Sequence, residues 1–201
     1  MKKSLFVLFS LCLNVSFSQD AMYEICPVKN SSEVPSANLW DINGEKVDIK
    51  KAASQKPTIL VFYRGGWCPY CMRHLSALAE VKNELDSMGY DLVGITPDDY
   101  TNLDSSITRS KEFDYTLLSD KEANAMDAFG ISWEIDDKLY EKYKDKYGLD
   151  VEWWGDSKHH KLPVPSVFII KEGKIQLQHV DPKYSQRLSA DLLLAMLKSL
   201  E

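Results

Sequence analysis

The sequence predicts one α/β domain with a mostly parallel sheet. Residues 58–63 and 91–96 are continuous apolar runs with β-branched members, as expected for strands covered on both faces. Helical spacing of apolar residues follows the first run, and strands that alternate with helices are typical of parallel sheets. A chain of 201 residues, 44% of them hydrophobic, is long enough to bury a core of its own.

The first 19 residues have the pattern of a secretory signal peptide. A basic start is followed by an uncharged, mostly apolar run over residues 5–17, and polar sequence comes next. The run is shorter than the roughly 20 residues that span a bilayer. We therefore expect export to the periplasm or beyond, and no stable membrane insertion. A buried N-terminal helix or an uncleaved anchor remains the alternative.

Residues 20–32 are polar and predict an irregular lead-in to a domain over residues 33–201. The domain opens with a hairpin over residues 39–49, which turns at Asn43-Gly44. Residues 50–56 read as a polar connector. After the strand at 58–63, a helix is expected from Cys68 to a stop at Gly89, with Pro69 at its first position.

In the second half of the chain, predicted strands and helices continue to alternate, with one interruption. The pattern predicts a helix over 100–111, a strand over 115–118, and a helix that residues 119–122 cap and that runs to Gly130. Residues 131–162 break the rhythm with a short helix and many aromatic residues, so we expect an insertion over the edge of the sheet. A hairpin over 167–178 and a helix over 189–199 complete the domain.

Composition excludes several classes of partner. The net charge is −6, and no basic cluster occurs beyond the first residues, so neither nucleic acid nor an anionic membrane surface is expected to bind. Without the signal segment, three cysteines remain: Cys26, Cys68 and Cys71. So few cysteines argue against a disulfide-rich scaffold. Cys26 is then either a buried apolar residue or a spare thiol.

The segment WCPYC at residues 67–71 predicts thiol redox chemistry. Cys68 is expected to cap the helix, where unpaired N–H groups of Tyr70 and Cys71 and the helix dipole stabilise a thiolate. Cys71, one turn further on, lies within reach for a disulfide. Cys68 is therefore the expected nucleophile and Cys71 its resolving partner. Three other interpretations of this cysteine pair compete with the redox one: half of a zinc site, a permanent structural disulfide, and two cysteines packed in the core.

Several neighbours are candidate supports for this dithiol. Arg64 is either an aid to a thiolate or a solvated surface arginine. Trp67 either shields the sulfurs or simply packs, and the pair Pro69 and Tyr70 tunes the redox poise. Pro165 precedes a strand and is either cis, facing the dithiol, or trans at a strand start. No metal ligand set is expected, because no second Cys-x-x-Cys follows. Three of the four histidines are interpreted as surface or loop residues: His74, His159 and His160.

The decapeptide FYRGGWCPYC at residues 62–71 resembles the signature of the peroxiredoxin-like branch of the alkyl hydroperoxide reductase/thiol-specific antioxidant family. Residues 162–170 and 179–184 resemble that branch too, and the likeness spans about residues 33–200. It implies a thioredoxin-like fold, with a central mixed sheet flanked by helices, and the antioxidant activity of thiol peroxidases. It also implies that Pro165 matches the cis-proline of such folds.

Two alignment frames assign opposite roles to the same cysteines. In the peroxiredoxin frame, Cys71 falls on the peroxide-attacking position, Cys68 replaces a threonine and Arg64 replaces a proline. In the thioredoxin frame, Cys68 is the nucleophile. The sequence leaves this choice open.

The leading hypothesis is an exported peroxidase that reduces hydroperoxides through a Cys68/Cys71 dithiol-disulfide cycle without a cofactor. A thiol donor such as a thioredoxin-like protein would reset the pair. One alternative is a disulfide reductase or isomerase of the cell envelope. The other is a non-enzymatic redox-sensing or binding module.

Overall fold

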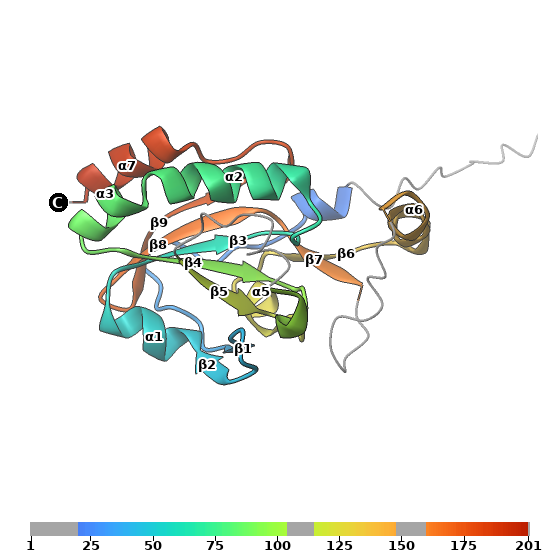
Figure 1. Cartoon of the computed structure of the whole chain (residues 1–201), viewed down its shortest axis with the longest axis horizontal. Coiled ribbons are helices and arrows are strands. Elements are labelled where there is room, and N and C mark those ends of the chain that lie inside the picture. The colour runs from blue at the N-terminus through green and yellow to red at the C-terminus, as the bar shows by residue number, and fades with distance from the viewer. Residues whose placement is uncertain (1–19, 104–114, 148–159, 201) are drawn as a thin grey trace, which may run out of the picture.

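The computed structural model describes residues 20–103, 115–147 and 160–200. Their centre is a seven-stranded sheet in the order β2-β1-β5-β4-β3-β8-β9 (Figure 1). A second sheet of two strands, β6 and β7, lies at one end of it. The strands are β1 Asn38–Trp40, β2 Lys46–Asp48, β3 Thr58–Phe62, β4 Asp91–Thr96, β5 Thr116–Ser119, β6 Ser132–Glu134, β7 Lys161–Pro163, β8 Ser166–Lys171 and β9 Lys174–Val180.

The predicted mixed sheet flanked by helices is confirmed. Only β3, β4 and β5 run parallel to one another, whereas β8, β9, β1 and β2 pair antiparallel. The expectation of a mostly parallel sheet is therefore wrong, because a hairpin forms each edge of the sheet and hairpin strands pair antiparallel. The helices are α1 Ile49–Gln55, α2 Pro69–Glu80, α3 Lys82–Ser87, α5 Asn124–Ala128, α6 Asp137–Tyr147 and α7 Ala190–Lys198.

The helices cover the two faces of the sheet in two groups. α2, α3 and α7 lie on one face, and α1 and α5 lie on the other (Figure 1). All five residues of β3 are buried, since this central strand contributes alternate side chains to both cores. The cysteine pair belongs to the core beneath α2.

Three local predictions need correction. The polar connector is helix α1, which Asp48 caps by accepting the N–H of Lys51 at 3.2 Å. The long helix after Cys68 is two helices, α2 and α3, which meet at Val81. The N-cap position of helix α5 is Ala123, the residue after the predicted cap at 119–122. Asp120 instead accepts hydrogen bonds from the N–H groups of Ala125 and Met126, at 2.9 and 2.8 Å.

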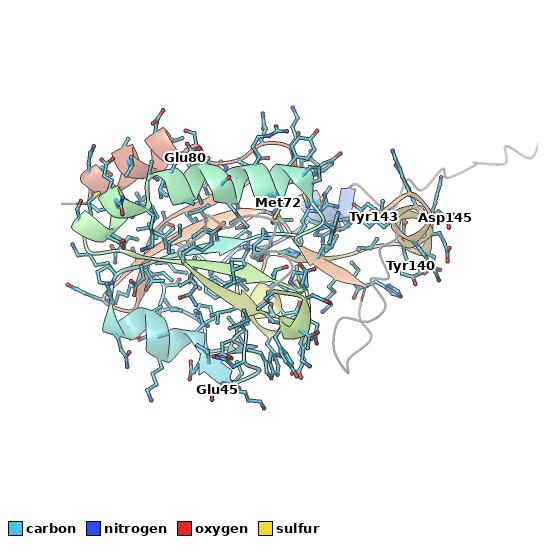
Figure 2. All side chains as sticks on the ribbon, in the orientation of Figure 1. Glu45, Met72, Glu80, Tyr140, Tyr143 and Asp145 are labelled. Carbon is cyan, nitrogen blue, oxygen red and sulfur yellow. The ribbon has the colours of Figure 1, made fainter. Side chains whose placement is uncertain are left out.

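The inserted helical and aromatic segment is present where it was expected. β6 and β7 pair antiparallel, and α6 stands beside the main sheet (Figure 1). Tyr143 lies on the side of α6 that faces the domain, whereas Asp145 points away (Figure 2). Trp153, Trp154 and His159, which belong to the same prediction, lie outside the described residues.

Two predicted segments lie wholly or mostly outside the described residues. The signal segment lies outside the described residues, as does most of the helix predicted over residues 100–111. Residues 20–32 contain the 3-10 helix Asp20–Tyr23 and otherwise no helix or strand. Within the described ranges, no helix has the length and apolar character needed to cross a membrane.

Candidate active site

The turn after the central strand β3 carries Cys68, and Cys71 lies in the first turn of α2. Cys68 occupies the N-cap position, and Pro69 is the first helical residue, as the sequence predicts. The turn requires a glycine at Gly65, whose φ is +146°. A Cβ atom there would lie 2.2 Å from Nε1 of Trp67 and 2.8 Å from Oδ1 of Asp98.

Cys68 has the properties of a thiolate nucleophile. Its side chain is buried, and its pKa is lowered to about 6, first because the Cys71 thiol donates a hydrogen bond to its sulfur. Burial opposes the shift, whereas the charges of Arg64 and Arg187 and the N–H of Cys71 favour the anion. Much of Cys68 is therefore ionised at neutral pH.

Cys71 has the opposite character. It is fully buried, and burial, together with the neighbouring Cys68 sulfur, raises its pKa well above the ordinary value. Nη2 of Arg187 lies 3.5 Å from its sulfur. Both thiols are in the reduced form. The electrostatics thus favour Cys68 as attacking group and Cys71 as the protonated partner. Cys26, the third thiol, is free and exposed.

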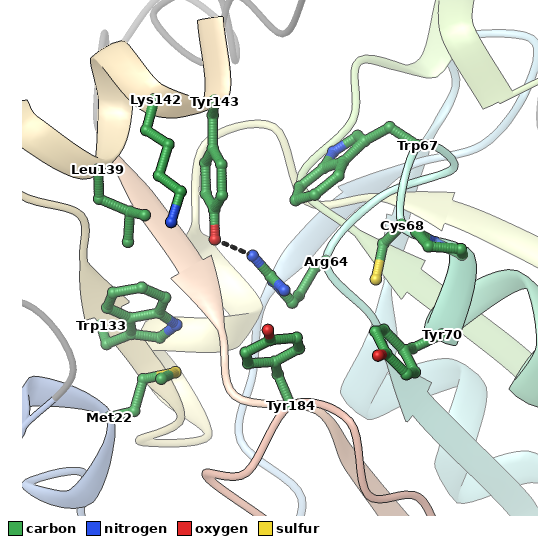
Figure 3. A pocket seen from close by; sticks show the side chains of 11 residues that line it. Met22, Arg64, Trp67, Cys68, Tyr70, Trp133, Leu139, Lys142, Tyr143 and Tyr184 are labelled. Atoms are coloured by element: carbon green, nitrogen blue, oxygen red, sulfur yellow. Dashed lines mark hydrogen bonds between the residues drawn. The ribbon is translucent and has the colours of Figure 1, made fainter. Parts of the chain in front are cut away.

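A pocket of about 410 Å³ lies in front of Cys68, whose sulfur points toward it (Figure 3). Its walls are mainly aromatic, with two cationic side chains and no carboxylate among the lining residues that the structure describes. Cys71 does not line it. The lining comprises Met22, Arg64, Trp67, Cys68, Pro69, Tyr70, Trp133, Leu139, Lys142, Tyr143 and Tyr184.

Arg64 stands in the middle of this pocket, and the reading of it as a solvated surface arginine is wrong. It is 4% exposed, and its Nη2 donates a hydrogen bond to the hydroxyl of Tyr143 (Figure 3). Three aromatic rings surround its guanidinium carbon, with centroids 5.0, 5.4 and 4.9 Å away, which are those of Trp67, Tyr143 and Tyr184.

The other predicted supports take different places. Trp67 packs on the Tyr143 ring with 5.5 Å between centroids, so the insertion does reach the dithiol turn. Tyr70 is partly exposed at the pocket and meets the Tyr184 ring edge-on at 5.8 Å. Pro69 also lines the pocket.

The prediction of a cis-proline at Pro165 is wrong, since no cis peptide bond occurs among the described residues. Pro165 connects β7 to β8, and the N–H of Val164 bonds to the carbonyl of Ile131 at 2.8 Å. The carbonyl of Pro165 accepts the N–H of Asp181 at 3.3 Å. These bonds hold the segment extended on both sides, as a trans peptide allows. Pro165 does not line the pocket.

Sequence reasoning missed several residues of the site. Asp98 is buried below the dithiol turn, and burial raises its pKa to about 6. Its position after β4 could have revealed it, because parallel neighbours such as β3 and β4 end at one edge. His74, expected at the surface, is buried, and burial lowers its pKa to about 4. No sequence signal marks Tyr143 or Arg187, which reach the cysteines only through the fold.

The described parts of the chain hold no group of three or more His, Cys, Asp or Glu side chains that could hold a metal ion. His160 packs against Tyr140, with 4.8 Å between ring centroids, rather than near the cysteines.

Comparison with known proteins settles the family. The AhpC/TSA family model matches residues 31–178, which is most of the chain. The chain belongs to the AhpC/TSA family. It is also similar to peroxiredoxin Bcp of Escherichia coli K12, with 29% identity over 105 residues. That match covers 52% of this chain and 66% of the relative's own length.

Solved structures of peroxiredoxins share the fold. Peroxidoxin BcpB from Mycobacterium tuberculosis superposes with a TM-score of 0.67 at 20% identity, covering 87% of this chain and 99% of that one. Reduced Prx3 from Vibrio vulnificus in complex with hydrogen peroxide gives a TM-score of 0.69 at 16% identity, covering 85% and 99%. The resemblance inferred from the decapeptide and the thioredoxin-like fold it implies are both confirmed.

Proposed function

We propose that this member of the family is a thiol peroxidase that reduces hydroperoxides through Cys68 and Cys71. One observation carries the proposal: a cysteine with a pKa near 6 faces a small pocket, with a protonated cysteine directly behind it. Family membership and the peroxiredoxin names of its relatives support the same reaction.

In the proposed cycle, the Cys68 thiolate attacks the outer oxygen of a hydroperoxide. A sulfur–oxygen bond forms, the oxygen–oxygen bond breaks, and the alkoxide or hydroxide that leaves takes up a proton. Cys68 becomes a sulfenic acid. The Cys71 thiol then condenses with it, so that a Cys68–Cys71 disulfide forms and water leaves. A thioredoxin-like dithiol donor reduces the disulfide and resets the pair.

The shape of the site favours a small substrate over a protein disulfide. Cys68 is 1% exposed, and its sulfur faces a partly open pocket of about 410 Å³. A pocket of that size suits a small molecule. A reductase or isomerase acting on folded proteins would need its attacking sulfur at an open surface, so this alternative fits the site less well.

The test is hydroperoxide consumption by the purified, reduced chain, with hydrogen peroxide or tert-butyl hydroperoxide as substrate and dithiothreitol or a thioredoxin as donor. A variant with both Cys68→Ser and Cys71→Ser is the control. Consumption well above that of the control supports the proposal. Equal rates for the two proteins would reject it.

We also propose that residues 1–19 direct the protein out of the cytoplasm. The basic start and the apolar run of residues 5–17 support this proposal. In fractionated cells, most of the protein should be found outside the cytoplasm, with a mature N-terminus near residue 20. Leu8→Arg, which breaks the apolar run, should retain it inside. Full-length protein confined to the cytoplasm would overturn the proposal.

A further inference from the structure

The inserted helix α6 brings one hydroxyl to the pocket of Cys68. Tyr143 lines this pocket, and its hydroxyl is hydrogen-bonded to Arg64, 79 positions earlier in the chain (Figure 3). The two side chains come from separate parts of the fold: Arg64 from the dithiol turn and Tyr143 from the insertion. A group that enters the site in this way is a candidate for chemistry rather than for core packing alone.

We propose, on the basis of the peroxidase function above, that Tyr143 is a catalytic residue whose hydroxyl donates a hydrogen bond to the leaving oxygen of the hydroperoxide. Arg64 supports the same oxygen with its charge. The inserted segment is then a component of the active site and not only a cover over the sheet.

The surroundings of Arg64 hold its guanidinium and the Tyr143 hydroxyl in place. The guanidinium lies among the rings of Trp67, Tyr143 and Tyr184, and the Trp67 and Tyr143 rings pack on each other. Aromatic faces attract the cation but accept no conventional hydrogen bond from it. The cation is therefore fixed in position while part of its donor capacity stays available.

Unused donors near the pocket indicate that it receives an acceptor-rich group. Nε of Arg64 and Nε1 of Trp133 are buried without a hydrogen-bond partner, although both residues line the pocket. In Figure 3 the indole nitrogen of Trp133 faces the pocket interior. Buried donors without acceptors are costly, so an oxygen acceptor that enters the pocket would satisfy them once the side chains turn to expose these N–H groups. An oxygen on which negative charge develops is such a group.

Tyr143 is suited to donate a proton in a hydrogen bond. Burial raises its pKa, and the opposing effect of Arg64 is smaller, so the hydroxyl stays protonated at neutral pH. During the reaction the sulfur of Cys68 bonds to the outer oxygen, and the electron pair of the broken oxygen–oxygen bond goes to the leaving oxygen. Tyr143 and Arg64 stabilise that anion until it takes a proton from solvent.

The experiment compares Tyr143→Phe with the wild-type chain by two reactions of the reduced protein. The first is oxidation by hydrogen peroxide and by tert-butyl hydroperoxide, followed by stopped flow. The second is alkylation of Cys68 by iodoacetamide across a pH series, which reports the thiolate without an oxygen leaving group. Tyr140→Phe is the matched control, because Tyr140 is on the same helix but does not line the pocket.

We expect the peroxide rate constant of Tyr143→Phe to fall by about 100-fold, as for the loss of one donor to a developing anion. Its alkylation profile should stay unchanged, and Tyr140→Phe should match the wild type in both reactions. An unchanged peroxide rate in Tyr143→Phe would overturn the inference and leave the peroxidase proposal intact. A parallel loss of both reactions would also overturn it, since Tyr143 would then act only through the Cys68 pKa. If the wild type itself does not react with peroxide, both proposals fail.

Discussion

The backbone N–H of Gly66 donates a hydrogen bond of 2.7 Å to the carboxylate of Asp98. This bond joins the dithiol turn to the segment that follows β4, the parallel neighbour of β3. Asp98 also lies directly beneath Gly65, where a Cβ atom would be 2.8 Å from its Oδ1. The position of Cys68 at the start of α2 therefore depends on a buried carboxylate from the segment after β4.

Asp98 should make stability depend on pH in an identifiable way. Burial raises its pKa from 3.8 to about 6 in the folded state, so the folded protein binds this proton more tightly than the unfolded chain. The free energy of unfolding therefore falls as pH rises from about 4 to 6, and the low value persists above that. Two pKa units correspond to about 3 kcal/mol.

Asp98→Asn should remove the pH-dependent contribution of this residue to the free energy of unfolding, because an amide does not ionise. The amide oxygen can still accept the Gly66 N–H, so the hydrogen bond is kept. Urea unfolding at pH 4.5 and pH 7.5 measures this contribution. The variant should gain stability relative to wild type at the higher pH. Asp120 also contributes to the wild-type profile, since burial raises its pKa to about 7, so the comparison rests on the difference between the two proteins. A pH-independent difference would contradict the assignment to Asp98.

The two thiols should titrate far apart. Alkylation of Cys68 by iodoacetamide should rise with pH around a midpoint near 6, whereas Cys71 should need strongly alkaline solution. Mass spectrometry of the digested protein measures the two sites separately. The same midpoint for both cysteines would show that the fold does not differentiate them.

Arg64→Gln should weaken both the thiolate and the reaction. Loss of the cation should raise the Cys68 pKa toward its ordinary value, and the peroxide rate constant should fall about 10- to 100-fold. Arg73→Gln is the control. Arg73 is exposed on α2 with its guanidinium carbon 5.7 Å from the Tyr70 ring, and it does not line the pocket. Equal effects of the two substitutions would point to net charge rather than to the position of Arg64.

Gly65→Ala should destabilise the fold more than Gly89→Ala. At Gly65 the new Cβ would overlap the Trp67 indole nitrogen at 2.2 Å with φ at +146°, so we expect a loss of about 3 kcal/mol. At Gly89, φ is +81° and no atom lies within 4 Å, so only the backbone strain of about 1 kcal/mol applies. Chemical denaturation gives both values, and similar losses would show that the close contacts at Gly65 relax freely.

The sequence predicts those parts of the fold that depend on local pattern. The apolar run that forms β3 and the Pro69 helix start after Cys68 follow from neighbouring residues alone. α1 was missed because Ile49 and Ala53 are the only residues of that helix with a buried side chain, too few to stand out as a helical pattern.

The sequence predicts the part of the site that lies in and around the dithiol turn: besides Cys68, the predicted supports Arg64, Trp67, Pro69 and Tyr70 line the pocket. The different environments of Cys68 and Cys71 come mostly from the fold, which buries Cys71 more deeply and brings the charges of Arg64 and Arg187 close to the Cys68 sulfur. The burial of Arg64 depends on Tyr143 and Tyr184, which approach it from distant elements. At Pro165 the family resemblance itself led to a wrong prediction. It implied a cis bond, whereas the hydrogen bonds of the neighbouring residues hold the chain extended.

The central claim is that Cys68, not Cys71, attacks the hydroperoxide. The most direct measurement exposes the reduced Cys71→Ser and Cys68→Ser variants to one equivalent of hydrogen peroxide with dimedone, which traps sulfenic acid, and locates the adduct by mass spectrometry. The account predicts a rapid adduct on Cys68 in Cys71→Ser and almost none in Cys68→Ser. A rapid adduct on Cys71, with Cys68 unmodified, would contradict it.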